Sequence, residues 1–225
     1  MGFAPRTGPD VVTRLLGQKL SELMKQPFVI DNRAGAGGQI AAQFVARSAP
    51  DGYNLLIAAF GAGTPGHFGA KMLAEQGRFK IEPVHFRATG DAVTALIAGD
   101  VHAALMSTAL ANAQIKGGKM RALATTAPTR SSMLPDVPTF KESGFSNADF
   151  SAWFCLFVLA GTPEPIIATL NTQLLAALQD ADLRRRLEEA GFSIIGTSPD
   201  AAKRMIAAET VKWKKVVTAT GFKGD

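Results

Sequence analysis

Residues 28–42 constrain the fold of this chain most strongly, because an apolar strand, a glycine-rich turn and a small-residue helix follow one another there. The turn carries Gly35, Gly37 and Gly38, and the helix begins directly after it. Such a turn presents backbone N–H groups at a helix N-terminus, where partial positive charge favours anions. The alternative is that the glycines only supply tight backbone geometry.

The same alternation of strands and helices continues along the chain. It predicts strands at 28–30, 53–59, 83–86, 101–106, 120–125, 152–160 and 192–195. It predicts helices at 9–24, 38–48, 91–98, 108–115, 163–178, 183–190 and 199–219, and one through His67. Residues 128–138 carry three prolines and are expected to form an irregular loop. This order is typical of an α/β protein with a mostly parallel sheet and helices on both faces.

Composition excludes several classes of function. The net charge of +5 is spread along the chain with one Tyr and two Trp, so the clustered charge and aromatics of a nucleic-acid binder are missing. No apolar run approaches the ~18 residues that span a bilayer, so direct membrane insertion is not expected. A dispersed positive charge favours an acidic small molecule as ligand.

Motifs for cofactors and catalysis are missing as well. Cys155 is the only cysteine and lies in an apolar run, which favours a buried inert thiol, and no Cys/His cluster has the spacing of a metal site. Ile40 occupies the last glycine position of a dinucleotide fingerprint, and neither a P-loop nor a Gly-x-Ser-x-Gly elbow is present. We therefore expect no metal, no cofactor and no catalysis.

Three glycine-containing loops remain as candidates for function: 3–9, 34–38 and 61–66. Each is predicted to join a strand to a helix, and ligands of open α/β sheets bind at the carboxyl ends of the strands. The loops offer backbone N–H groups and the hydroxyls of Thr7 and Thr64 without a nucleophile, which suits a binder of carboxylates. His67 follows the third loop, where it can donate to an anion or cap its own helix. Asp10 stands at a helix start, where capping explains it.

Taken in order, these segments resemble the periplasmic solute-binding proteins of tripartite tricarboxylate transporters, the TctC or Bug family. Residues 3–12 are similar to the family's first ligand loop and helix start, and 27–38 to its "P-V-V-V-x-N-R-P-G-A-G-G" segment. Residues 49–56 match "A-P-D-G-Y-T-L-L", and 61–67 are similar to the "S-A-G-x-G-T-x-x-H" loop. Residues 119–124, 134–139 and 161–163 also fit the family.

The resemblance implies a periplasmic binding protein-like fold, with two doubly wound lobes around a cleft that closes on a small organic carboxylate. The first lobe would comprise residues 1–60 and 151–225, and the second lobe residues 61–150. It also implies delivery of the ligand to membrane permease subunits, and export to the periplasm with a signal peptide that has been removed. Carried over by motif, the ligand contacts would be Phe3, Ala4, Thr7, Gly8, Pro9, Ala62, Gly63, Thr64 and His67.

Two of the chain's departures from the family pattern are missing segments. The first strand is reduced to Gly2 and Phe3, and a long segment that crosses the hinge is missing between Ala59 and Gly61. Two alternatives to a binding protein therefore stay open: an α/β enzyme that uses His67 as a base, and a shortened paralogue that folds but binds nothing.

Overall fold

The computed structural model describes residues 1, 5, 7–35, 38–58, 65–82, 84, 86, 89–145 and 150–220, with the backbone alone at 58, 65–67, 71, 89 and 219–220. The chain divides into two compact units. Unit 1 comprises Met1–Ala62 and Trp153–Lys215, and unit 2 comprises Gly63–Ala152 and Val216–Lys223. None of the helices described is both long and apolar enough to cross a membrane.

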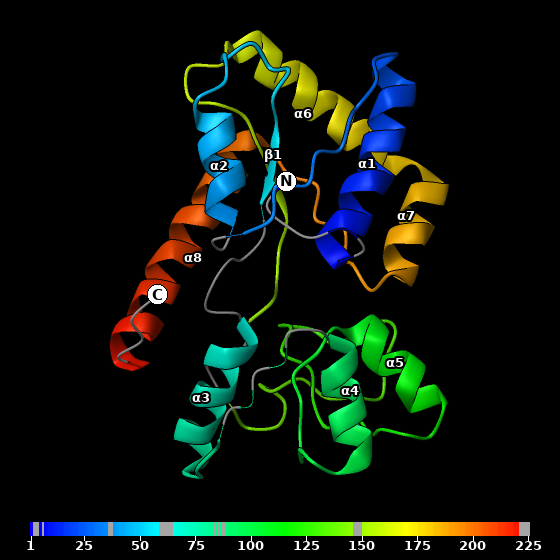
Figure 1. The fold of residues 1–225 in the computed structure, drawn as a ribbon, viewed down its shortest axis with the longest axis vertical. Helices are drawn as coiled ribbons and strands as arrows, with labels where there is room; N and C mark the ends of the chain where they lie inside the picture. Colours follow the sequence, from blue (N-terminus) through cyan, green and yellow to red (C-terminus); the bar gives the residue numbers. More distant parts are fainter. Residues whose placement is uncertain are drawn as a thin grey trace. The chain divides into compact units, whose positions relative to one another are not determined.

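Unit 1 is built around three packed helices. Helix α1 (Gly8–Met24) lies against α6 (Glu164–Gln179) and α7 (Ala181–Glu189), as Figure 1 shows. The apolar residues of α1 recur at helical spacing and so form one buried face. The core that these helices enclose consists of Val12, Leu20, Ala177, Leu183 and Leu187. Helix α1 ends where Lys25 adopts a left-handed conformation at φ 53°.

A two-stranded ladder lies beside these helices. Strand β1 (Leu56–Ala58) pairs with β2 (Cys155–Phe157) in antiparallel register, with Ile57 opposite Leu156. Helix α2 (Gln39–Ala46) packs beside β1, and most of α8 (Pro199–Thr220) belongs to the same unit. Both strands fall inside predicted apolar runs. Their pairing direction differs from the mostly parallel sheet that the alternation predicts, because an apolar run specifies burial and leaves the direction of its partner open.

Several predicted strands are not regular strands in the structure. Residues 28–30, 101–106 and 192–195 form no ladder with another strand, and in 120–125 only Thr125 makes an isolated bridge. Side chains expected on a sheet face are exposed instead: Val29 by 85%, Leu123 by 66% and Ile195 by 66%. A strand needs a neighbour to take up its backbone hydrogen bonds, and sequence periodicity does not supply one.

The start of the chain is hydrogen-bonded to the segment between α1 and α2. The Met1 amino group donates to the Asp31 carbonyl, and the Arg33 amide donates to the Met1 carbonyl at 2.7 Å. Met1 thus bonds to both neighbours of Asn32. Partial burial lowers the pKa of this amino group, and the nearby Asp31 offsets part of that effect.

Unit 2 contains helices α3 (Pro65–Gly77), α4 (Thr89–Ala98) and α5 (Thr108–Lys116). Predicted helices match all three. The proline-rich loop that follows is irregular as expected, and Arg130 holds it: this residue donates to the Glu142 carboxylate at 3.0 Å and to the Pro135 carbonyl at 3.2 Å. Thr139 and Glu142 cap each other reciprocally, because the Thr139 amide donates to Glu142 at 2.7 Å and the Glu142 amide to the Thr139 hydroxyl at 3.1 Å.

Candidate functional site

The first candidate loop leads directly into α1. Thr7 is the N-cap in an extended conformation, and its side chain makes no capping hydrogen bond. Gly8 and Pro9 open the helix, and proline is well suited to a first turn because it lacks an N–H group that would need a partner. The structure thus places Thr7, Gly8 and Pro9 together at a helix N-terminus, where the helix dipole attracts anions.

Gly8 occupies this position because there is little room for a side chain. A Cβ atom at residue 8 would lie 3.2 Å from Cζ of Phe192. The Phe192 ring is itself held edge-on against Phe154, with ring centroids 5.4 Å apart. The α1 N-terminus therefore rests on a packed aromatic pair of unit 1.

The remaining predicted contacts fall outside what the structure describes. Phe3, Ala4, Ala62, Gly63 and Thr64 are among the residues that are not described. His67 lies in the first turn of α3, and only its backbone is described. The nine predicted contacts therefore stay a prediction, with three of them brought together at α1.

The glycine-rich turn before α2 requires glycine at both of its described glycine positions. Gly35 has φ 125° and Gly38 has φ 90°, and the Gly38 amide donates to the Gly35 carbonyl at 2.9 Å. Gly38 is also the N-cap of α2. Arg33 anchors the turn: its guanidinium lies 3.7 Å above the centre of the Phe44 ring, and its Nε donates to Asp31 at 2.7 Å.

Asp10 has contacts beyond the helix-start position by which the sequence analysis explained it. Its carboxylate is buried and accepts hydrogen bonds from Arg14 Nε at 3.0 Å and from Asn32 Nδ2 at 2.9 Å. Arg14 Nη2 also donates to Asn32 Oδ1 at 3.0 Å, which closes a ring of three side chains. The hydrogen bond to Asp10 raises the pKa of Arg14. The i, i+4 spacing of Asp10 and Arg14 is visible in the sequence, whereas the contact with Asn32 has no local signal.

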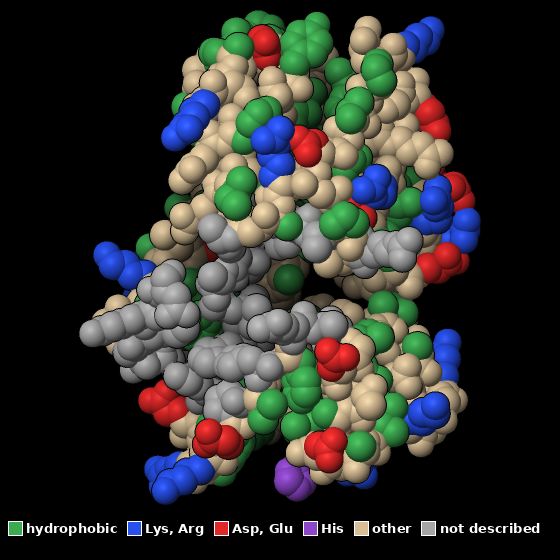
Figure 2. Space-filling model, in the orientation of Figure 1, with side chains coloured by type: hydrophobic (Ala, Val, Ile, Leu, Met, Phe, Trp, Pro, Cys, Tyr) green, Lys and Arg blue, Asp and Glu red, His purple; other side chains and the backbone are tan. Residues whose placement is uncertain are grey.

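Other chemistry is sparse on the described residues. They contain no group of three His, Cys, Asp or Glu side chains that could hold a metal ion. Cys155 lies in β2, is half-buried, and burial raises the pKa of its thiol, so it is a poor nucleophile at neutral pH. Lys and Arg lie at separate places over the face drawn in Figure 2. On α7 they are paired with acids, as in the ion pair of Arg185 with Asp182.

The fold is that of the periplasmic binding proteins. It aligns with the periplasmic binding protein BugD over 99% of this chain and 96% of that one, with a TM-score of 0.81 and 23% identity. MatC (Rpa3494) from Rhodopseudomonas palustris, solved with bound malate, aligns over 96% of both chains with a TM-score of 0.78 and 26% identity. Rpa4515 from R. palustris, solved with adipate, aligns over 96% of this chain and 95% of that one, with a TM-score of 0.83 and 25% identity.

Within that class the family is clear. The family model of TctC, the tripartite tricarboxylate transporter family receptor, matches residues 12–59 and 54–222. The chain belongs to the TctC family, as its motifs indicate. The two matched pieces meet at residues 54–59, next to the place where the sequence analysis locates a missing segment. The family and these structural neighbours are solute-binding proteins.

Proposed function

We propose that this protein is a periplasmic solute-binding protein that captures a small organic carboxylate, such as a di- or tricarboxylate, and passes it to a tripartite tricarboxylate-type permease. The observation that carries the proposal is the TctC match, which extends from residue 12 to residue 222. Two structural neighbours at 25–26% identity were solved with malate and with adipate, both of which are dicarboxylates. This chain would bind an acid of the same chemical class.

The described geometry supports an anionic ligand. Helix α1 begins at Gly8 and Pro9, and α2 begins after a glycine-rich turn. Helix N-termini of this kind bind carboxylates through backbone N–H groups, and the dipole adds a favourable charge term. Asp10 would otherwise repel the ligand, but Arg14 and Asn32 occupy both of its carboxylate oxygens.

The ligand contacts that we propose are those that the motifs imply. Backbone amides and hydroxyls would hold the carboxylate, with one imidazole as a further donor. These residues are Phe3, Ala4, Thr7, Gly8, Pro9, Ala62, Gly63, Thr64 and His67.

Isothermal titration against malate, adipate and citrate tests the binding proposal. We expect saturable heat at one site per chain with at least one of these acids. The matched control is the neutral dimethyl ester of malate, which keeps the carbon skeleton and lacks the charge, and which should give no heat. A correctly folded protein with neither heat nor thermal shift for any acid would contradict the proposal and favour a paralogue that has lost binding.

The enzyme alternative is separated from binding by recovering the ligand. After long incubation with the protein, mass spectrometry should return the acid unchanged. Conversion of the acid, lost in a His67→Ala variant, would favour catalysis with His67 as the base.

Delivery and location need experiments in cells. The protein should appear in the fraction released by osmotic shock, and deletion of its gene should reduce uptake of the radiolabelled acid that it binds. Normal uptake in the deletion strain would contradict a role in supplying the permease.

A further inference from the structure

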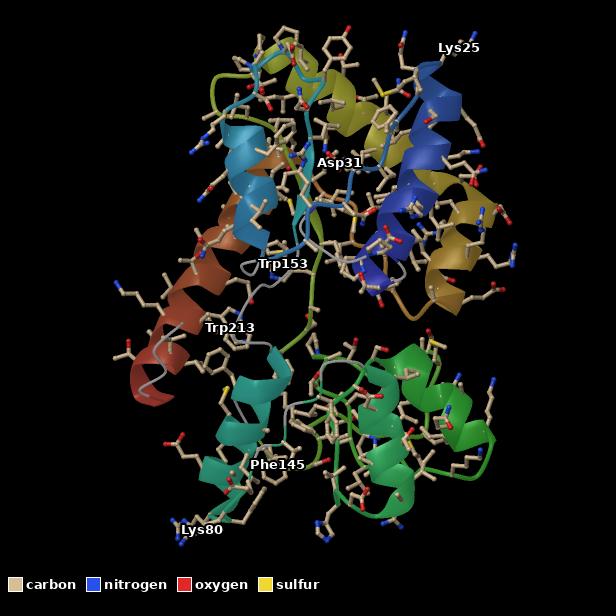
Figure 3. The ribbon with its side chains drawn as sticks, viewed as in Figure 1. Lys25, Asp31, Lys80, Phe145, Trp153 and Trp213 are labelled. Atoms are coloured by element: carbon tan, nitrogen blue, oxygen red, sulfur yellow. The ribbon has the colours of Figure 1, made fainter. Side chains whose placement is uncertain are left out.

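The ring formed by Asp10, Arg14 and Asn32 connects two parts of unit 1 that lie far apart in the sequence. Asp10 and Arg14 are one turn apart on α1, and Asn32 lies on the segment between α1 and α2, next to Asp31, which Figure 3 labels. Each member of the ring bonds to both of the others, at 2.9–3.0 Å. The ring therefore fixes the first turn of α1 against residue 32.

Burying the Asp10 carboxyl group raises the free energy of the folded state, and the hydrogen bonds of the ring must offset that increase. Asp10 is only 2% exposed, although its side chain is a carboxyl group. A buried carboxylate is unfavourable unless it is paired and hydrogen-bonded, and apolar replacements of such groups are often as stable as the original. Buried polar groups are retained in some proteins because they specify one geometry. Asp10 could specify a geometry in this way, because one of its oxygens bonds to Arg14 on the same helix and the other to Asn32 on the segment that follows the helix.

In this protein the ring lies between the two candidate loops of unit 1, the loop before α1 and the glycine-rich turn before α2. On one side of the ring, Asp10 directly follows Thr7, Gly8 and Pro9. On the other side, Asn32 directly precedes Arg33, whose guanidinium lies 3.7 Å from the centre of the Phe44 ring on α2. Side-chain contacts thus link the first turn of α1 to Asn32 and link Arg33 to α2, and the backbone joins Asn32 to Arg33.

We propose that Asp10 is a positioning residue which, through Arg14 and Asn32, holds the α1 loop and the glycine-rich turn as one unit. The ring does not touch the ligand in this scheme. It keeps the backbone donors of both loops oriented, and its effect on affinity rests on the proposed function.

Two substitutions break the ring, one at Arg14 and one at Asn32. Arg14→Lys keeps the charge beside Asp10 but loses the planar guanidinium that donates to Asp10 and Asn32 together. Asn32→Ala removes the amide that bonds to both other members. The matched control is Arg185→Lys on α7, where Arg185 also pairs with acids within its own helix and is exposed.

Hydrogen exchange measured by mass spectrometry tests, without a ligand, whether the ring holds the two loops together. Both ring variants should speed exchange at the amides of residues 31–35 on the order of tenfold, as expected when hydrogen bonds to a charged group are lost. The slowly exchanging amides of α6 should stay unchanged, and Arg185→Lys should change neither region. Unchanged exchange at 31–35, or equally faster exchange throughout unit 1, would overturn the proposal, since the second result reports general destabilisation.

Titration with the acid that the wild-type protein binds gives the second readout. Each ring variant should weaken binding about tenfold, and the double variant should be scarcely weaker than either single one, because each change breaks the same ring. Additive losses of affinity would contradict the proposal that both residues act through one ring. If the wild-type protein binds no acid while exchange at 31–35 responds as expected, the proposed function is wrong. The proposal that the ring holds the two loops together is then still supported.

Discussion

Lys19 Nζ on α1 lies 2.6 Å from Asp180 Oδ2, at the N-terminus of α7. The second carboxylate oxygen of Asp180 accepts a hydrogen bond from the Leu183 amide at 3.0 Å and so caps α7. One carboxylate therefore performs two tasks: it starts a helix and joins that helix to α1. The buried side chains of Leu183 and Leu187 then pack into the core that α1, α6 and α7 share.

The two tasks of Asp180 can be separated by substitution. Asn is as good an N-cap as Asp, so Asp180→Asn keeps the cap and loses the ion pair, whereas Asp180→Ala loses both. We expect a small fall of the melting temperature for Asp180→Asn and a fall of a few degrees for Asp180→Ala, measured by calorimetry. Equal falls would show that the cap contributes nothing.

The same pair predicts how stability depends on pH. The hydrogen bond from Lys19, followed by that from the Leu183 amide, lowers the pKa of Asp180 in the folded state. Because the folded pKa is lower than the unfolded one, the contribution is present above the unfolded value and is lost as the pH falls through the folded value. Wild-type protein should therefore lose more stability than Asp180→Asn below about pH 4, and the two curves should run parallel near neutrality.

Another prediction concerns Gly52, which follows Asp51 in the turn before β1. Its φ of 83° strains any residue with a side chain, and a Cβ atom there would lie 2.5 Å from Cγ2 of Ile166 on α6. Gly52→Ala should cost about 1–2 kcal/mol for the left-handed backbone and about 1–3 kcal/mol more for the overlap.

Gly161 supplies the matched control for Gly52. Its φ is 87°, and a Cβ atom there would meet nothing within 4 Å. Gly161→Ala should therefore show the backbone cost alone, as a smaller decrease in the free energy of unfolding by urea. Adding Ile166→Ala to Gly52→Ala should cost less than the two single changes together, and strict additivity would argue against the overlap.

The helices could be predicted closely from the sequence, and this agreement has a physical reason. Helix hydrogen bonds are local, so apolar spacing together with a start signal such as Pro9 or Pro163 fixes both the element and its approximate ends. The strands at 53–59 and 152–160 were located for their continuous apolar character, but their antiparallel pairing joins residues about a hundred positions apart. No local pattern carries that information.

In the candidate site, too, the local features could be predicted from the sequence and the tertiary contacts could not. Thr7, Gly8 and Pro9 could be placed at a helix start because the signals are adjacent in the sequence. The contact of Asp10 with Asn32 was missed, since Asn32 lies 22 residues away in the sequence. A local rule places Asp10 at the helix start, and the tertiary contact with Asn32 adds to that position.

A further prediction contrasts two glycines inside helices of unit 2. Gly69 lies within α3, and a Cβ atom there would come within 2.0 Å of the buried Phe150 ring. Gly90 lies in the first turn of α4 with nothing within 4 Å of such an atom. Glycine normally weakens a helix relative to alanine by about 0.5–1 kcal/mol. Gly90→Ala should thus be neutral or slightly stabilising, whereas Gly69→Ala should destabilise by about 1–3 kcal/mol.

Thermal unfolding of both variants provides the measurement for this pair. Combining Gly69→Ala with Phe150→Leu, which removes the ring atoms in the way, should recover part of the loss relative to Phe150→Leu alone. A stabilised Gly69→Ala protein would mean that α3 and residue 150 are not packed as described.

The last prediction concerns His67 as a ligand contact of the proposed binding protein. An imidazole that donates to a carboxylate contributes a charge-assisted hydrogen bond, and its loss weakens binding about tenfold or more. His67→Ala should therefore raise the dissociation constant for the bound acid by that factor in isothermal titration. His102→Ala is the matched control, because His102 is exposed in the same unit and lies outside the ligand motifs, and it should leave the affinity unchanged. Equal affinities of the His67→Ala and wild-type proteins would remove this residue from the site, since a side chain that holds the carboxylate cannot be deleted without a loss of binding.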